Sequence, residues 1–193
     1  MNKHLNKAIK IVKSGGIIIY PTDTAFGIGC RIDDIAAVKK LFKLRKRPDE
    51  KAVPILVSSV EMAENFTTDK TQLTADLMKK YWPGGLTVVA KSRQSVPSIV
   101  RGGGETIGVR MPNHNSTLEL IRKVGVPIVG CSANFAGEPT PYKMSDLNPE
   151  LIKLVDFVLP GRCSVKKAST VVDVTNGKIK ILRVGAVKLG VSS

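Results

Sequence analysis

Hydrophobic side chains repeat along the chain with two different periods, and each period predicts one kind of element. Leu5, Ile9 and Val12 recur at the spacing of one helix face, in a lysine-rich segment that stops at two glycines. This pattern predicts an amphipathic helix. Residues 17–20 instead form an unbroken apolar run rich in β-branched side chains, which predicts a buried strand.

Both patterns continue through the rest of the chain. Helices are expected at residues 35–42, 60–66, 73–81, 118–124 and 145–155. Strands are expected at residues 52–57, 86–90, 106–110, 127–131, 156–159, 170–174 and 179–184. The last two strands are joined by Asn176-Gly177, a dipeptide typical of a tight hairpin turn. Residues 21–30 are polar, contain two glycines and are expected to form a loop.

The order of these elements predicts the fold class. Strands and helices mix without an internal repeat or a long linker, and 193 residues is a usual length for one domain. We therefore predict a single α/β domain over residues 1–193, built on a mixed sheet.

The chain also carries a strong positive charge. Its 30 lysines and arginines exceed its 16 aspartates and glutamates, which gives a net charge of +14 and a pI of about 9.9. An excess of this size points to anionic partners such as nucleic acid or nucleotides, although a solvated lysine surface would produce the same number.

Cysteines, histidines and apolar runs exclude several classes of protein. The three cysteines are far apart and form no CxxC pair, and the only histidines are His4 and His114. We therefore expect neither a disulfide framework nor a protein metal site. The first four residues do not begin a signal peptide, and the apolar run at residues 17–20 is too short to span a bilayer. We expect a cytoplasmic protein with no membrane contact.

Four predicted strands run into loops rich in hydroxyl, amide or arginine side chains. These loops are residues 20–24, 109–112, 130–134 and 168–170. Ligands of α/β sheets usually bind at strand ends, because the sheet fixes the groups that the loops present. One such loop is usually only a turn, but four in one short chain favour a shared pocket.

A basic segment follows the second predicted helix. Arg45-Lys46-Arg47-Pro48 and Lys51 can cap that helix on a solvated face, or they can clamp phosphate oxygens with paired guanidinium donors. The GxxxxGK[ST] motif does not occur, and Gly102–Gly104 lacks the spacing of a dinucleotide fingerprint. Cys131 is interpreted as a buried small side chain rather than a nucleophile. Arginine, lysine, hydroxyl and amide groups fit attack on an ATP phosphate, in which the protein supplies orientation and charge.

Seven segments, in order, resemble the motifs of the YrdC-type threonylcarbamoyl-AMP synthases. They are YPTDTAFGIGC at residues 20–30, RKRP at 45–48, WPGGLT at 82–87, GVRMP and the nearby histidine at 108–114, SAN at 132–134, STVVD at 169–173 and ILRVG at 181–185. One such motif would be weak, but seven in the right order are highly specific.

The resemblance implies a twisted mixed sheet flanked by helices, with a concave, positively charged cavity. It also implies a reaction in which L-threonine, bicarbonate or CO2, and ATP with Mg²⁺ give threonylcarbamoyl-AMP and pyrophosphate. That product supplies the threonylcarbamoyl group of a modified tRNA adenosine. The implied partners are therefore downstream tRNA threonylcarbamoyl-transferase proteins, and tRNA itself if the basic surface contacts it.

The resemblance further implies roles for individual residues. The residues expected to bind threonine are Thr24, Arg110, Ser132 and Ser169. The residues expected to bind ATP are Arg47, Lys51, Thr106, Asn134, Tyr142 and Arg183. The residues expected to act in catalysis are Arg45, Arg47, Ser132 and Asn134.

Two positions depart from the family pattern. Arg45 stands where lysine is usual, so a planar fork of donors replaces a point charge. Leu56 stands where the longer, two-domain relatives often have a histidine. We also expect the extra C-terminal domain of those relatives to be absent.

Two other functions stay open on the sequence alone. An RNA-binding or ribosome-associated module of the same fold would use the basic concave surface without chemistry. Such surfaces favour exposed aromatic side chains, and this chain has only 5% aromatic residues, none clustered. A paralogue acting on another carbamoylated substrate is the third possibility, against which the complete set of Arg47, Ser132 and Asn134 argues.

Overall fold

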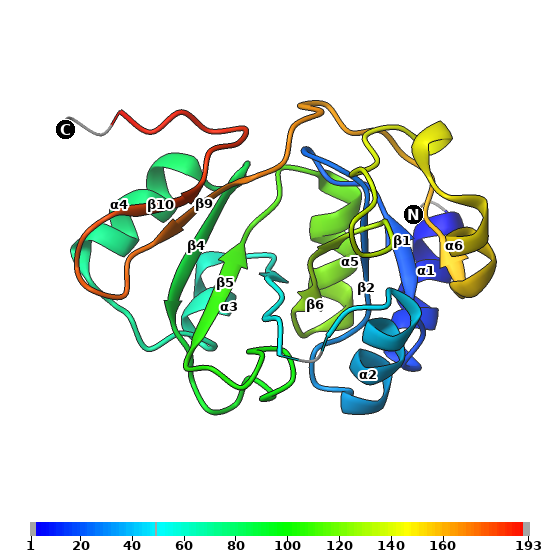
Figure 1. The fold of residues 1–193 in the computed structure, drawn as a ribbon, viewed down its shortest axis with the longest axis horizontal. Helices are drawn as coiled ribbons and strands as arrows, with labels where there is room; N and C mark the ends of the chain where they lie inside the picture. Colours follow the sequence, from blue (N-terminus) through cyan, green and yellow to red (C-terminus); the bar gives the residue numbers. More distant parts are fainter. Residues whose placement is uncertain (1–2, 49, 191–193) are drawn as a thin grey trace.

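Two hydrogen-bonded sheets form the framework of the protein (Figure 1), whose computed structural model describes residues 3–48 and 50–190. The larger sheet has the strand order β10-β9-β4-β5-β3-β6. Its strands are β3 (Ile55–Leu56), β4 (Leu86–Lys91), β5 (Thr106–Arg110), β6 (Ile128–Val129), β9 (Thr170–Asp173) and β10 (Lys180–Arg183). The smaller sheet has the order β7-β2-β1-β8. Its strands are β1 (Ile18–Tyr20), β2 (Gly27–Gly29), β7 (Cys131–Ser132) and β8 (Phe157–Val158).

Both sheets are mixed. In the larger sheet β4 pairs in parallel with β9 and antiparallel with β5, while β3 pairs in parallel with β5. In the smaller sheet β1 pairs in parallel with β8 and antiparallel with β2. The predicted α/β class is confirmed, with the strands in two sheets rather than in one.

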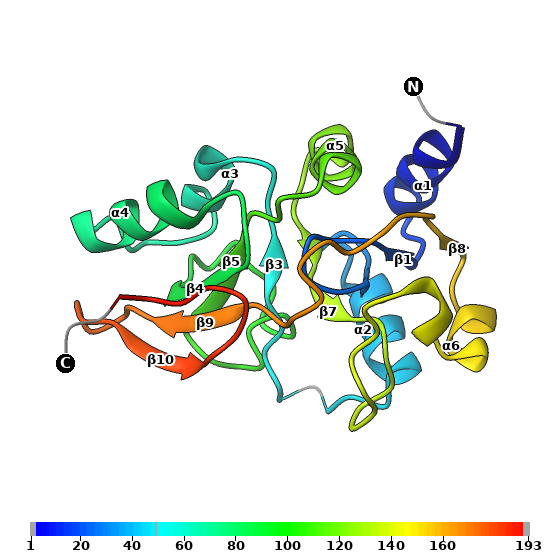
Figure 2. The ribbon, with the colours of Figure 1, turned by 90° about the horizontal axis from the view of Figure 1, so that it is seen from above.

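Helices cover mainly one side of these sheets. They are α1 (Lys3–Lys13), α2 (Ile35–Leu44), α3 (Val60–Glu64), α4 (Gln72–Tyr81), α5 (Asn115–Val124), α6 (Pro149–Leu154) and the 3-10 turn η1 (Met144–Asp146). Figure 2 shows α1, α3, α4 and α5 along one side, while α2 and α6 lie toward the other side at one end. No helix in the described part of the chain is both long and apolar enough to cross a bilayer.

Alternation along the strands of the larger sheet separates a core face from an open face. In β4, Leu86, Val88 and Ala90 are fully buried in the core, whereas Thr87 and Val89 point to the opposite face and line a cavity. In β5 the core residues are Ile107 and Val109, and the residues on the cavity face are Thr106, Gly108 and Arg110. Because side chains alternate between the two faces of a strand, one sequence pattern builds both the core and the cavity floor.

Residues 21–30 were expected to form a loop, and that prediction is wrong for residues 27–29. They form β2, which pairs with β1 in the register Tyr20↔Gly27 and Ile18↔Gly29. A Cβ atom on Gly27 would lie 2.7 Å from the Tyr20 ring, and one on Gly29 would lie 2.1 Å from the Val129 carbonyl oxygen. Glycine is therefore required by close approach here, although it normally weakens a strand prediction.

Two other predicted elements are interrupted. The helix expected at residues 145–155 is split into η1 and α6, because Asn148 caps a new helix whose first residue is Pro149. The strand expected at residues 127–131 is split at Gly130, so that β6 belongs to the larger sheet and β7 to the smaller one. The Gly130 amide donates to the Pro54 carbonyl at 2.8 Å, and a Cβ on Gly130 would lie 2.9 Å from the Leu56 side chain.

Candidate active site

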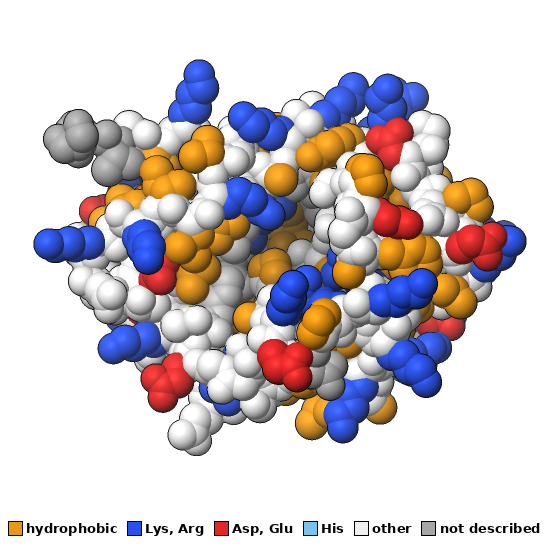
Figure 3. Space-filling view, in the orientation of Figure 1, with side chains coloured by type: hydrophobic (Ala, Val, Ile, Leu, Met, Phe, Trp, Pro, Cys, Tyr) orange, Lys and Arg blue, Asp and Glu red, His pale blue; other side chains and the backbone are white. Residues whose placement is uncertain are grey.

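A cavity of about 470 Å³ opens between the two sheets. Figure 3 shows it as a hollow near the centre of the molecule, with lysine and arginine side chains around it. Its floor is the open face of the larger sheet, and its wall comes from β1, β2, β7 and the loops that follow them. Its size is within the range of small-molecule sites in proteins.

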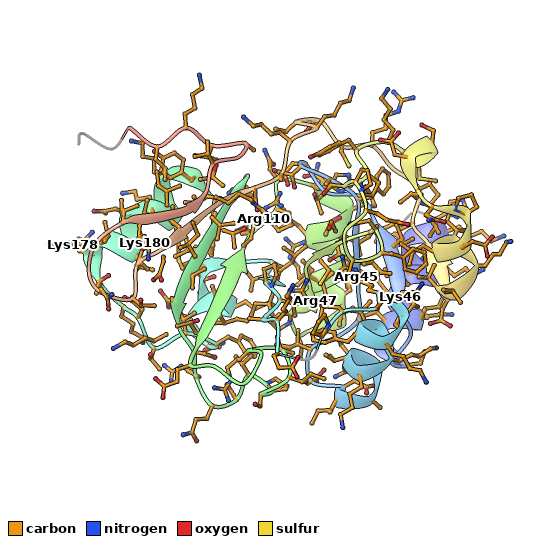
Figure 4. The ribbon with its side chains drawn as sticks, in the orientation of Figure 1. Arg45, Lys46, Arg47, Arg110, Lys178 and Lys180 are labelled. Carbon is orange, nitrogen blue, oxygen red and sulfur yellow. The ribbon has the colours of Figure 1, made fainter. Side chains whose placement is uncertain are left out.

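The cavity brings together most of the residues that the sequence singled out. Those that line it are Thr24, Arg45, Arg47, Thr106, Arg110, Ser132, Ser169 and Arg183. They come from loops and strands spread from residue 24 to residue 183 of the chain. Figure 4 shows Arg45, Arg47 and Arg110 around the hollow, whereas Lys178 and Lys180 lie at the far end of the larger sheet.

Three predicted residues are not among those that line the cavity. Asn134 is buried, and its Nδ2 donates to the carbonyl oxygens of Phe135 and Glu138 at 2.9 and 2.7 Å. Its buried Oδ1 has no hydrogen-bond partner among the described residues. Lys51 is exposed and contributes its carbonyl oxygen to Arg47. Burial lowers the pKa of Arg183, and Tyr142 lies close enough to this arginine to act in the opposite direction.

Arg110 is held rigidly at one end of the cavity. Its Nε donates to the Gly84 carbonyl at 2.9 Å, its Nη1 donates to Thr24 Oγ1 at 2.6 Å, and its Nη2 forms an ion pair with the Asp23 carboxylate. Burial lowers the pKa of Arg110 and the Asp23 charge opposes this, so the guanidinium stays cationic. These bonds use three of the five N–H groups, which leaves two for a ligand.

Asp23 belongs to this site, although the sequence analysis gave it no role. Its carboxylate also accepts the Asn113 amide at 3.1 Å, and its carbonyl accepts the Val165 amide at 2.7 Å. Its side chain is 4% exposed, as buried as the Arg110 side chain that it pairs with. A signal was present in Thr22-Asp23-Thr24 directly after a buried strand, since a buried arginine needs a carboxylate partner.

The opposite end of the cavity holds two arginines without such a partner. The Nε of Arg45 donates to the Asn134 carbonyl at 3.0 Å. Arg47 donates through Nε to the Lys51 carbonyl at 3.3 Å and through Nη2 to the Ala52 carbonyl at 2.7 Å. Among the described residues no ion pair involves either guanidinium. Burial lowers the pKa of Arg47, and the neighbouring charge of Arg45 lowers it further.

Arg183 and two hydroxyl groups form a third group on the floor. Arg183 donates through Nε to the Ser169 carbonyl and through Nη2 to Ser169 Oγ, both at 2.9 Å. Ser169 Oγ lies 2.9 Å from Thr87 Oγ1, and both hydroxyl-bearing residues are buried. Sequence reasoning missed Thr87, whose signal was its position between two core residues of β4.

The cavity can therefore hold an anion. Four arginines line it, and among the residues that the structure describes no aspartate or glutamate does; Asp23 pairs with Arg110 but is not a lining residue. Cations that line a cavity and lack an ion-pair partner favour negatively charged ligands. Within residues 3–48 and 50–190, no three His, Cys, Asp or Glu side chains are placed to hold a metal ion. Cys131 lines the cavity as a buried thiol whose pKa is raised by burial, and Leu56 adds apolar surface to the floor.

Several known proteins resemble this chain in sequence at moderate identity. Threonylcarbamoyl-AMP synthases of Pyrococcus abyssi and Bacillus subtilis are 31% and 30% identical over 94% of the chain, which spans only 54% and 53% of them. The protein of the same name from Vibrio cholerae is 32% identical over 84% of the chain and 87% of its own length. The chain thus spans about half the length of the first two relatives.

Solved structures share its fold. P. abyssi Sua5 complexed with L-threonine aligns with a TM-score of 0.87 at 30% identity, over 94% of this chain and 54% of that one. Escherichia coli YciO aligns with a TM-score of 0.83 at 28% identity, over 94% and 88%. A family model described as "Telomere recombination", which groups Sua5, YciO and YrdC, matches residues 10–185. The chain belongs to this Sua5/YciO/YrdC family.

Proposed function

We propose that the protein is an L-threonylcarbamoyladenylate synthase, a nucleotidyltransferase that joins L-threonine, bicarbonate or CO2, and ATP. One observation carries the proposal: a single cavity joins a carboxylate-paired arginine among hydroxyl groups to arginines that form no ion pair with any described residue. The first arrangement suits a small hydroxylated amino acid, and the second suits a polyphosphate. The names of the V. cholerae and P. abyssi relatives support the same reaction.

Threonine is proposed to bind at the Arg110 end. The two N–H groups that Arg110 has left would pair with the threonine carboxylate, since guanidinium matches a carboxylate with two parallel hydrogen bonds. Thr24, Ser132 and Ser169 would bind the remaining polar groups of threonine. A site that hydrogen-bonds a hydroxyl rejects an analogue that lacks it, because its own buried polar group is left unpaired.

ATP is proposed to bind along the other arginines. Arg45, Arg47 and Arg183 would offset the phosphate charges, and Thr106 would bind at the edge of the floor. Asn134 would act through Arg45, because its backbone carbonyl accepts a hydrogen bond from the Nε of Arg45. Lys51 would hold Arg47 through its carbonyl and reach ATP only with its exposed side chain, and Tyr142 would act beside Arg183.

In the proposed reaction, the threonine amine forms a C–N bond with CO2 and releases a proton, which gives a carbamate. A carbamate oxygen then attacks the α-phosphorus of ATP, and the bond from this phosphorus to the bridging oxygen breaks. Pyrophosphate leaves with the electron pair. The substrates supply nucleophile and leaving group, so Arg45, Arg47, Ser132 and Asn134 would contribute orientation and charge stabilisation.

Magnesium is proposed to enter with the nucleotide. The described residues of the cavity lining offer hydroxyl groups but no carboxylate, and Mg²⁺ commonly keeps its waters and binds substrate phosphates. When bound it would neutralise pyrophosphate charge. We further propose that the product serves tRNA threonylcarbamoyl-transferase proteins in the cytoplasm, and that tRNA contacts the basic surface.

The test is pyrophosphate release by the purified protein with ATP, Mg²⁺, bicarbonate and threonine. We expect release that depends on threonine and falls at least tenfold when valine replaces it. An Arg93→Ala variant is the matched control, because Arg93 also donates to carbonyl oxygens but does not line the cavity. Threonine-independent release, or none above background, would remove the proposed activity.

A further inference from the structure

The residue between the two unpaired arginines has an unusual backbone. Lys46 has a φ of 53°, in the left-handed region that L side chains rarely adopt. Apart from glycines, only Lys166 shares such a positive φ within the described residues. Strained backbone of this kind persists where the surrounding structure enforces it, and it is frequent at binding sites.

The strain belongs to the way that helix α2 ends. The Lys46 amide donates to the Lys43 carbonyl at 3.1 Å, and the Arg47 amide donates to the Phe42 carbonyl at 2.9 Å. This pair of bonds is the Schellman motif, whose left-handed residue is usually glycine. Here Arg45 is the last half-helical residue, Lys46 takes the glycine position and Arg47 follows it.

The left-handed turn decides where the flanking side chains point. Arg45 and Arg47 both line the cavity, while Lys46 is exposed and lies on the far side of them (Figure 4). If α2 continued as a helix, residues two apart would differ in direction by about 200°. The two guanidinium groups would then face away from each other, and only one could reach the cavity.

Contacts with a second loop hold the turn in place. The Arg45 carbonyl accepts the Ala136 amide at 3.1 Å, and the Nε of Arg45 donates to the Asn134 carbonyl at 3.0 Å. The Lys46 ammonium lies 5.6 Å from the centre of the Phe135 ring, within the range of a cation–π contact. The same short segment therefore holds both the backbone and the side chain of the turn.

We propose that Lys46 is a positioning residue for the nucleotide: its left-handed backbone turns Arg45 and Arg47 into one anion-binding cavity. The inference rests on the proposed function for the identity of the anion. The turn itself, and the way that it directs Arg45 and Arg47 into the cavity, do not depend on which anion binds there.

The test compares Lys46→Gly, Lys46→Asn and Lys46→Val. All three remove the ammonium and its contact with Phe135, but glycine and asparagine accept a positive φ whereas a β-branched side chain does not. We expect the KM for ATP to rise at least tenfold in Lys46→Val, with the KM for threonine changed less than threefold. Both constants should stay within threefold of wild type in Lys46→Gly and Lys46→Asn.

A binding measurement separates this proposal from the proposed activity. Calorimetric titration with inorganic pyrophosphate needs no turnover, and Lys46→Val should bind it at least tenfold more weakly than Lys46→Asn. If wild type binds pyrophosphate but shows no threonine-dependent release, a weakened valine variant still supports the role of Lys46. If wild type binds neither ATP nor pyrophosphate, both proposals are overturned.

Equal constants for the valine and asparagine variants would overturn the positioning role. Circular dichroism and the thermal midpoint report whether Lys46→Val folds. If it does not, Lys46→Ala replaces it, because alanine keeps a Cβ at the strained position. The KM for ATP should then rank glycine and asparagine below alanine, and a different order would contradict the proposal.

Discussion

The two ends of the cavity hold arginine in two different ways. At one end Arg110 is buried against Asp23, and its remaining bonds to Gly84 and Thr24 fix the guanidinium plane. At the other end Arg45 and Arg47 donate to carbonyl oxygens of their own and a neighbouring loop. The first cation is neutralised and fixed in direction, whereas the other two keep their charge available.

Because of this difference, one cavity can bind two anions in different ways. A neutralised arginine attracts a charge weakly but presents two N–H groups in a fixed plane, which suits recognition of one small carboxylate. Arginines without counter-charges attract strongly and select little, which suits a polyphosphate of high charge. Stability should therefore depend on the first end, and nucleotide affinity should depend on the second.

The free energy of unfolding should respond most strongly to a change at the Arg110 end. Asp23→Asn keeps the shape of the side chain but leaves Arg110 buried without a counter-charge, so the free energy of unfolding should fall by about 3–5 kcal/mol. Urea denaturation measures it. The control is Asp33→Asn, which breaks the exposed Arg31–Asp33 pair of 2.6 Å and should cost less than about 1 kcal/mol. Equal losses in the two variants would contradict the comparison.

The next effect comes from binding an anion at the end of the cavity that holds Arg45 and Arg47. Pyrophosphate at a hundred times its Kd should raise the free energy of unfolding of wild type by about 2.7 kcal/mol, because it binds only the folded state. Urea denaturation with and without pyrophosphate measures the gain. Sodium chloride at the same ionic strength is the control. An equal gain from chloride would mean that general screening, rather than a built site, stabilises the protein.

Removing one arginine from the end that holds Arg45 and Arg47 should affect function more than stability. Arg47→Ala should lower kcat/KM for ATP at least tenfold, or about 1.4 kcal/mol, since it removes a charge proposed to contact phosphate. Its free energy of unfolding should change by less than about 1 kcal/mol, because the partners that it leaves are half-exposed carbonyl groups. Steady-state kinetics and urea denaturation measure the two quantities.

Arg93→Ala is again the matched control for this substitution. Its guanidinium donates to the carbonyl oxygens of Glu64 and Thr67 and does not line the cavity. The control should leave kcat/KM unchanged. If Arg47→Ala retained the wild-type kcat/KM for ATP, the end that holds Arg45 and Arg47 would not be the nucleotide site.

Local patterns predicted most of the helices and strands, because apolar residues such as Leu86 and Val88, which are buried, recur in the sequence at helix or strand spacing. The strand β2 was missed because Gly27 and Gly29 are poor strand formers, and only the distant Tyr20 ring and Val129 carbonyl explain them. The division into two sheets depends on Gly130, whose role is set by contacts with Pro54 and with Leu56. Such contacts link residues far apart in the chain and leave no local signal.

The candidate site was predictable to a similar degree. Polar strand-end loops predicted a shared pocket, and the family resemblance singled out Thr24, Arg110, Ser132 and Ser169 within those loops; all four line the cavity. The carboxylate that pairs with Arg110 and the turn at Lys46 were not predicted, since both depend on how side chains meet in three dimensions. Motif resemblance also named Asn134, but its side-chain amide donates to the carbonyl oxygens of Phe135 and Glu138 and does not line the cavity.

A weaker effect should be a pH dependence of stability that is confined to the Arg110 end. His114 caps helix α5, and its Nδ1 accepts the Thr117 amide at 3.4 Å. Burial lowers the pKa of His114, while the Asp23 charge acts in the opposite direction. The unfolded chain therefore binds the proton more readily, so this contribution to stability is present above the unfolded pKa of about 6.5 and is lost as the pH falls below it.

His114→Asn isolates that contribution, because asparagine can cap a helix but does not titrate. The free energy of unfolding of wild type should fall faster than that of the variant between pH 6.5 and 5. The shared carboxylates titrate in both proteins, so the difference between the two stability curves is due to His114.

Pyrophosphate affinity should show no such difference, because the charge that acts on His114 is that of Asp23, whereas the charge that acts on Arg47 is that of Arg45. If the free energies of unfolding of the two proteins fell in parallel with pH, His114 at the Arg110 end would make no pH-dependent contribution. A pyrophosphate affinity that followed His114 would mean that the two ends are not independent.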